Sequence, residues 1–234
     1  MQALLLTRPN PSNPPTLTLT RCPKPVPPAG HILVRVYASA VQPSDKFNAK
    51  AGFASTTFPR IPGRDFSGVV ASGPDEGVAV FGTSGPDLGF TADGAHAEFV
   101  VVAEDAVARK PVGLSHERAA CLGVPLTTAW LAIEAAGVGS GDQVAVLGAR
   151  GAVGEPVCAL LRRRQCRILA AIRGPGADID TVSDPGLTTV RKKTDSEKGV
   201  AAVIDTVGDP GLTRAAVEEA LAHKGRLVLL TTRK

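Results

Sequence analysis

The chain of 234 residues is 44% hydrophobic, 21% charged and only 4% aromatic, a composition typical of a globular protein long enough for one large or two small domains. These figures exclude a collagen-like repeat, a coiled coil and a disordered chain, and no apolar run approaches the roughly 18 residues that a membrane span requires. The net charge of +4 arises wholly in the C-terminal half, because residues 1–117 carry ten basic and ten acidic side chains while residues 118–234 carry sixteen and twelve. With few aromatic rings to stack on bases, nucleic-acid binding is not expected, and a small phosphate-bearing molecule is the favoured anionic partner.

The cellular setting is predicted from the N-terminus and the cysteines. The first residues lack the basic start and the cleavage site of a secretory signal. The four cysteines, at positions 22, 121, 158 and 166, contain no C-x-x-C pair, so neither a zinc knuckle nor a disulfide framework is indicated. We therefore expect a reducing, cytoplasmic protein.

Residues 1–113 are predicted to be mostly β-structure with turns rich in Gly and Pro. Eight of the nineteen prolines lie in the first thirty residues, and proline interrupts strand pairing, so short strands joined by stiff turns are expected. The predicted strands are, in chain order, residues 3–7, 17–20, 32–38, 68–71, 78–81 and 95–102.

After residue 113 the pattern changes to short apolar strands that alternate with helices. Ser115 is expected to cap a short helix, and the next helix would place Leu126, Trp130 and Ile133 on one side. The predicted elements are helix 126–136, strand 143–147, helix 155–164, strand 167–172, a weaker strand 179–182, strand 200–207, helix 213–223 and strand 226–230. This alternation predicts a parallel sheet with helices on both faces.

The strongest functional signal lies between the strand 143–147 and the helix that follows it. Glycines there let the backbone approach a pyrophosphate, and the N–H groups of the helix N-terminus face the anion. The pattern has Ala where the common fingerprint has its first Gly, and its strand–loop–helix context predicts a dinucleotide site. The assigned cofactor-binding residues are Gly148, Ala149, Arg150, Gly151, Ala152, Val153 and Gly154. The alternative is a tight strand–helix turn that binds no ligand.

The end of the next strand predicts which dinucleotide is bound. An NAD site would place an acidic residue there for the ribose hydroxyls, whereas this chain has Arg173. A guanidinium can pair with a 2′-phosphate, so the sequence favours NADPH as the cofactor. The alternative is an ordinary exposed arginine in a loop.

Several segments, in order over nearly the whole chain, resemble the medium-chain dehydrogenase/reductase superfamily and specifically its zinc-free quinone oxidoreductase branch. The matching segments are residues 39–45 (SAVQPSD), 58–70 (FPRIPGRDFSGVV), 93–99 (DGAHAEF), 124–130 (VPLTTAW), the glycine loop, 203–208 (VIDTVG) and 225–228 (GRLV). The resemblance implies an α/β protein with a β-rich, GroES-like catalytic domain over residues 1–121. It also implies a Rossmann-type NAD(P)-binding domain, a doubly wound parallel sheet, over residues 122–234.

The resemblance also bears on metal binding. Zinc enzymes of this superfamily carry a Cys and a His at the positions that hold Gln42 and Arg64 here. Neither side chain can replace a thiolate or an imidazole as a zinc ligand. We therefore expect no metal.

The site residues carried over by position are Gln42, Asp45 and Thr128, which the resemblance places in the nicotinamide pocket, with Val207 added to the cofactor contacts. Without a metal, hydride transfer to a conjugated carbonyl needs hydrogen-bond donors for the developing oxygen. Many relatives have a Tyr two residues after the Asp as the proton donor, but this chain has Phe47. Lys46, solvent or a substrate group must then donate the proton. The alternative roles are structural, with Asp45 as a helix cap and Thr128 as an interior hydroxyl.

These observations predict an NADPH-dependent oxidoreductase that transfers hydride to a quinone or enone without a metal. The alternative is a nucleotide-binding protein, or a truncated reductase, with little or no turnover. The Rossmann-type sheet is expected to be incomplete, because a six-strand nucleotide fold has the order 3-2-1-4-5-6 and only five strands are predicted. An uncovered fifth strand would be an exposed edge, so association into a homo-oligomer through that edge is expected.

Overall fold

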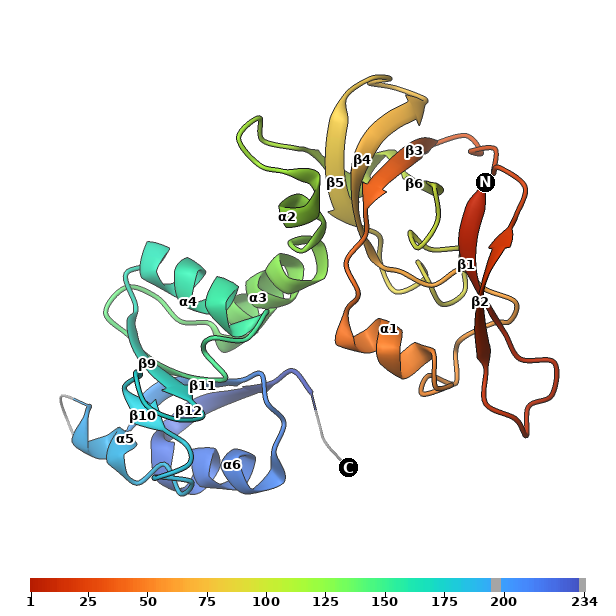
Figure 1. Cartoon of the computed structure of the whole chain (residues 1–234). Coiled ribbons are helices and arrows are strands. Elements are labelled where there is room, and N and C mark those ends of the chain that lie inside the picture. Colours follow the sequence, from red (N-terminus) through yellow and green to blue (C-terminus); the bar gives the residue numbers. More distant parts are fainter. Residues whose placement is uncertain (195–198, 232–234) are drawn as a thin grey trace. The chain divides into compact units, whose positions relative to one another are not determined.

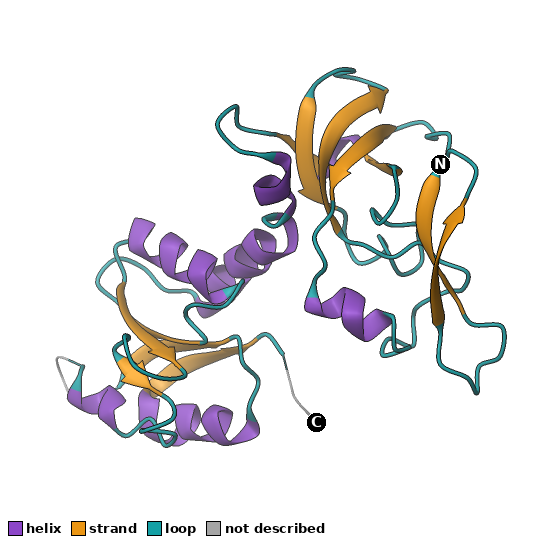
Figure 2. Cartoon of the chain, viewed as in Figure 1, coloured by secondary structure: helices purple, strands orange, loops and turns teal. Residues whose placement is uncertain are grey.

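The computed structural model describes residues 1–194 and 199–231. The chain divides into two compact units, Met1–Val124 and Pro125–Lys234. Strands dominate the first unit, and strands alternate with helices in the second (Figures 1 and 2). In the described part of the chain, no helix combines the length and the apolar character needed to cross a bilayer.

The first unit contains two antiparallel sheets. The smaller sheet pairs β1 (Gln2–Thr7) with β2 (Thr16–Arg21). The larger sheet has the order β6-β3-β4-β5-β7, and its strands are β3 (His31–Ala38), β4 (Asp65–Ser72), β5 (Ala79–Thr83), β6 (Phe99–Ala103) and β7 (Val107–Arg109). The helices are α1 (Pro43–Asn48), a 3₁₀ turn (Glu104–Ala106) and α2 (His116–Ala120). Apolar side chains from β3, β4, β5 and β6 form one buried core in this unit.

The strand predicted over residues 95–102 is shorter in the structure and begins at Phe99. The reason is that its first residues bond to a different segment. The N–H groups of Ala95 and His96 donate to the carbonyls of Gly63 and Pro62, at 3.0 and 2.9 Å. This pairing brings the loop before β4 next to His96.

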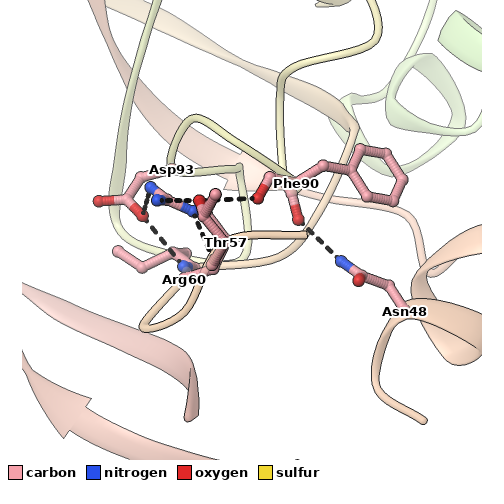
Figure 3. A network of polar contacts seen from close by, with 7 residues as sticks. Asn48, Thr57, Arg60, Phe90 and Asp93 are labelled. Carbon is pink, nitrogen blue, oxygen red and sulfur yellow. Dashed lines mark hydrogen bonds and ion pairs between the residues drawn. The ribbon is translucent and has the colours of Figure 1, made fainter. Parts of the chain in front are cut away.

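A polar network holds the same region of the first unit in place (Figure 3). The Arg60 guanidinium forms an ion pair with Asp93 at 2.8 Å and donates to the Thr57 hydroxyl at 2.7 Å. The Thr57 N–H donates to the carbonyl of Phe90 at 3.0 Å. Asn48, at the end of α1, donates to the carbonyl of Gly89 at 2.8 Å. The network therefore ties α1 and the segment before β4 to the loop at residues 89–93.

The second unit is a five-stranded parallel sheet with the order β10-β9-β8-β11-β12. Its strands are β8 (Gln143–Leu147), β9 (Arg167–Ile172), β10 (Ile179–Asp180), β11 (Val200–Asp205) and β12 (Leu221–Leu229). The helices are α3 (Gly123–Ala136), which begins at the end of the first unit, then α4 (Gly154–Arg163), α5 (Thr189–Lys192) and α6 (Pro210–Ala215), which continues as a π-helical turn (Ala216–Ala220).

Two separate cores show that helices cover both faces of this sheet. Val144 and Val146 of β8 pack with side chains of α3 and α4. The alternate residues, Ala145 and Leu147, pack with α5, α6 and the π-helical turn. Because neighbouring side chains in a strand point to opposite faces, β8 contributes to both cores. The prediction of a doubly wound parallel sheet is confirmed.

In the second unit, the predicted helix end at residue 223 and the predicted start of the last strand at residue 226 are wrong. The helix predicted over residues 213–223 ends at Ala220, and β12 follows at once. In α3, Ile133 is buried, whereas Trp130 is 54% exposed. The buried face of α3 is instead formed by alanines at positions 129, 132 and 136, whose small side chains let the helix lie close to the sheet. The Trp130 ring remains at the surface, where the Arg164 guanidinium lies 5.4 Å from its centre.

Candidate cofactor loop and polar cluster

The glycine loop follows β8 and opens α4, as the sequence predicts. Gly148 has φ +77°, a conformation that favours glycine. The Gly151 N–H donates to the Gly148 carbonyl at 2.8 Å, which closes the turn. A Cβ on Gly154 would overlap that same carbonyl oxygen. The backbone of the loop is therefore folded onto the first turn of α4, where an anion would meet N–H groups without intrahelical partners.

A buried carboxylate organises the neighbouring loop after β11. The Asp205 carboxylate accepts hydrogen bonds from the N–H groups of Val207 and Gly208, at 2.8 and 3.0 Å. Its other oxygen accepts from the Thr213 hydroxyl at 2.8 Å. The Thr206 hydroxyl donates to the Leu147 carbonyl at 2.8 Å and so joins this loop to the end of β8. Asp205 thus shapes the loop that carries Val207.

Three of the predicted cofactor residues share one cavity, and two others line a second one. Gly148, Arg173 and Val207 line one cavity of about 1030 Å³ at the carboxyl end of the sheet. Ala149 and Arg150 line a second cavity, of about 680 Å³, between α4 and the end of β9. The remaining predicted residues line neither cavity. Gly151 and Ala152 are exposed in the loop, Val153 directly precedes α4, and Gly154 begins that helix. Thr128 is half-buried on α3.

In the first unit, Gln42 and Asp45 belong to a buried polar cluster. Gln42 stands directly before α1, and its backbone N–H donates to the Asp45 carboxylate at 2.7 Å. The Gln42 side-chain amide donates to the carboxylate of Asp65 at 2.7 Å. The other oxygen of Asp65 accepts from the Val124 N–H at 2.8 Å, at the start of α3. Lys46 lies outside the cluster and is exposed.

Burial raises the pKa of both carboxyl groups. Burial raises the pKa of Asp65 from 3.8 to about 6, against the hydrogen bonds from Val124 and Gln42, which lower it. Burial also raises the pKa of Asp45, while its bond from Gln42 and the charges of His96 and Arg64 lower it. In both groups, removal from water disfavours the charged form.

The contacts of Asp45 are those of the structural alternative, because it bonds the backbone at the start of α1 as a capping residue does. Gln42 retains further hydrogen-bonding capacity, since an amide has two N–H donors and one acceptor oxygen. Asp65 received no role from the sequence. The signal that could have identified Asp65 is an acidic residue at the first position of a strand that has no other charged residue.

The residues at the zinc positions do not fit a zinc ion. The Gln42 amide donates to Asp65, and the Arg64 guanidinium donates to the Gly85 carbonyl at 2.9 Å. Zinc sites in proteins are built from Cys, His, Asp and Glu. Within residues 1–194 and 199–231, no three or more such side chains cluster in a way that could hold a metal ion.

Comparison with known proteins identifies the family. Residues 28–112 match the alcohol dehydrogenase GroES-like domain. The chain is 45% identical over 172 residues to a zinc-type alcohol dehydrogenase-like protein of Schizosaccharomyces pombe, an alignment that covers 73% of this chain and 53% of that protein. The quinone oxidoreductase of Thermus thermophilus, solved also in complex with NADPH, is 29% identical with a TM-score of 0.78, and the match covers 98% of this chain and 74% of that one. This chain belongs to the medium-chain dehydrogenase/reductase superfamily.

The resemblance and the fold class predicted from the sequence are thereby confirmed. Another similar protein is the 2-methylene-furan-3-one reductase of Solanum lycopersicum, which is 35% identical over 145 residues. This alignment covers 56% of this chain and 36% of that enzyme. The chain spans about half the length of the Schizosaccharomyces pombe relative and less of the tomato enzyme.

Proposed function

We propose that this medium-chain dehydrogenase/reductase protein is an NADPH-dependent oxidoreductase that transfers hydride to a conjugated carbonyl, in a quinone or an enone, without a metal. The observation that carries the proposal is the shared cavity of Gly148, Arg173 and Val207 beside the glycine loop. In that cavity the backbone of the glycine loop could approach a pyrophosphate. Arg173, at the end of β9, would contact the adenosine ribose.

The residues present fit a nicotinamide dinucleotide. The loop from Gly148 to Gly154 would hold the pyrophosphate, because neither end has room for a side chain. A Cβ on Gly148 would meet the side chains of Thr206 and Val207, and a Cβ on Gly154 would overlap the backbone of Gly148. Val207 would contact the cofactor from the loop that Asp205 organises. When bound, NADPH supplies the hydride for reduction of the acceptor.

Arg173 supports NADPH over NADH. It directly follows β9, is exposed, and lines the cavity beside the loop. A charge-assisted hydrogen bond to phosphate contributes about 1.5–3 kcal/mol, which corresponds to roughly ten- to hundredfold discrimination.

The proposed acceptor class rests on the relatives and on the chemistry of Gln42. The relatives named above include a quinone oxidoreductase and an enone reductase, and both reactions develop negative charge on an oxygen. The free donor capacity of the Gln42 amide suits that oxygen. In this proposal Asp45 positions Gln42 through its backbone bond, and the exposed Lys46 supplies the proton.

The proposal includes the setting and the assembly of the protein. The four cysteines are free thiols, which suits a reducing cytoplasm. In the sheet of the second unit, β12 is at one end of the strand order, and the proposed homo-oligomer forms through its outer edge. Metal independence follows from Gln42 and Arg64 at the zinc positions.

The test is a set of titrations and assays on the purified chain. We expect NADPH to bind at least tenfold more tightly than NADH, Arg173→Ala to remove that preference, and a panel of quinones and enones to drive NADPH oxidation. Elemental analysis should find no stoichiometric zinc. Binding of NADPH without oxidation by any acceptor would support the nucleotide-binding alternative, and equal affinity for the two dinucleotides would refute the cofactor assignment.

A further inference from the structure

The glycine loop carries a second cation, and its contacts point to the segment that Arg173 begins. Arg150 lies between Ala149 and Gly151 in the loop, and its guanidinium donates a hydrogen bond to the carbonyl of Gly176. That carbonyl lies three residues after Arg173, in the connection between β9 and β10. The side chain of Arg150 therefore extends from the loop to the connection that follows β9, although Arg150 and Arg173 line separate cavities. The end of β9, where this connection starts, is the position at which a dinucleotide's adenosine ribose is bound.

The turn that contains Gly176 has room for the Arg150 guanidinium and is itself held in place. A Cβ on Gly176 would lie 3.1 Å from an Arg150 guanidinium nitrogen, so the glycine provides the space in which the guanidinium lies. The turn between Arg173 and Gly176 is itself held, because the Gly174 N–H donates to the Asp180 carboxylate at 2.7 Å. The same carboxylate oxygen also accepts from the Val182 N–H at 2.9 Å.

The cavity that Arg150 lines contains side chains of both charges. Arg162 of α4 lines the same cavity, and so do the acidic residues Glu155 and Asp178. One oxygen of the Asp178 carboxylate accepts a hydrogen bond from the N–H of Ala170, at 2.7 Å. A guanidinium presents five N–H donors in a planar fork, so Arg150 can keep its bond to Gly176 and still bind two phosphate oxygens.

We propose that Arg150 is a specificity-determining residue that binds the 2′-phosphate of NADPH together with Arg173. This inference rests on the proposed function and adds a second cation, from the loop itself, to the one that the strand end supplies. Its hydrogen bond to Gly176 holds the guanidinium in place before the nucleotide arrives, so less side-chain freedom is lost on binding.

The experiment measures binding rather than turnover. Dissociation constants are determined by calorimetry for two fragment probes, adenosine 2′,5′-bisphosphate and 5′-AMP, and for NADPH and NADH. The variants are Arg150→Gln, which removes the charge but keeps a donor for Gly176, and Arg150→Lys, which keeps the charge but removes the fork. Arg163→Gln, at an exposed position of α4, is the matched loss of one positive charge.

We expect Arg150→Gln to weaken the bisphosphate and NADPH at least tenfold while 5′-AMP and NADH change less than twofold, with a smaller loss in Arg150→Lys and none in Arg163→Gln. An equal loss for all four probes would show that Arg150 only shapes the loop and would overturn the inference. Retention of the full NADPH preference in Arg150→Gln would overturn it while leaving the proposed function intact. Failure of the unmodified chain to bind either dinucleotide would overturn both.

Discussion

The sharpest prediction concerns Asp65, a carboxyl group that is fully buried at the start of β4. Both of its oxygens accept hydrogen bonds, from the Gln42 amide at 2.7 Å and from the Val124 N–H at 2.8 Å. In Asp65→Asn the side chain is neutral at every pH. Its oxygen can still accept from Val124, and its NH₂ can donate to Gln42 once the Gln42 amide has rotated by half a turn.

The magnitude follows from the pKa of Asp65, which is raised from 3.8 to about 6 in the folded protein. The folded state then binds a proton more tightly than the unfolded chain does. The resulting stabilisation is fully present below pH 3.8 and is lost as the pH rises through about 6. The difference between the two pKa values corresponds to about 3 kcal/mol in the free energy of unfolding. At pH 7 we therefore expect Asp65→Asn to be more stable than the unmodified protein by up to about 3 kcal/mol.

The assay is guanidinium chloride unfolding, followed by far-ultraviolet circular dichroism, at several pH values from 4 to 7.5. The quantity of interest is the difference in unfolding free energy between the unmodified protein and Asp65→Asn. Asp45 is also buried with a raised pKa, but it is present in both proteins and cancels in the difference. Asp105→Asn, at an exposed position, serves as the control, whose difference from the unmodified protein should stay constant. A difference for Asp65→Asn that is equally flat between pH 4 and 7 would refute the reasoning.

The remaining predictions concern the glycine loop and a helix cap. Gly154→Ala should abolish NADPH binding in a fluorescence titration, because the new Cβ would overlap the Gly148 carbonyl oxygen. The control is Gly139→Ala, whose Cβ would meet no atom within 4 Å, and this variant should bind NADPH normally. Unimpaired binding in Gly154→Ala would contradict the assigned loop geometry. Ser115→Ala removes the hydroxyl that accepts the Arg118 N–H at 3.3 Å, and should cost about 1 kcal/mol, seen as a melting temperature lowered by roughly 2–4 °C. The cap contributes nothing if the melting temperature of Ser115→Ala is unchanged.

Local patterns were enough to predict two central strands of the second unit and the loop and helix between them. The strands 143–147 and 167–172 have the predicted bounds, and the helix between them begins and ends one residue earlier than predicted. Continuous apolar runs and glycines constrain the chain within a few residues. The cap at Ser115 is also local, since the hydroxyl bonds the N–H three residues later. The superfamily could be recognised from such segments because each carries its own short-range constraint.

Only the tertiary structure decided the polar cluster and the surface of α3. Gln42, Asp65 and Val124 are far apart in the chain, and a buried carboxyl group is tolerated only where distant segments supply its hydrogen bonds. No periodic pattern in the sequence predicts the contacts among these three residues. Trp130 was expected on one side of α3 together with Ile133, but the α3 residues that pack in the core are Ile133 and the alanines at positions 129, 132 and 136, whose side chains are smaller than that of Trp. Which apolar stripe of a helix is buried depends on the shape of the surface it packs against, and that surface exists only after folding.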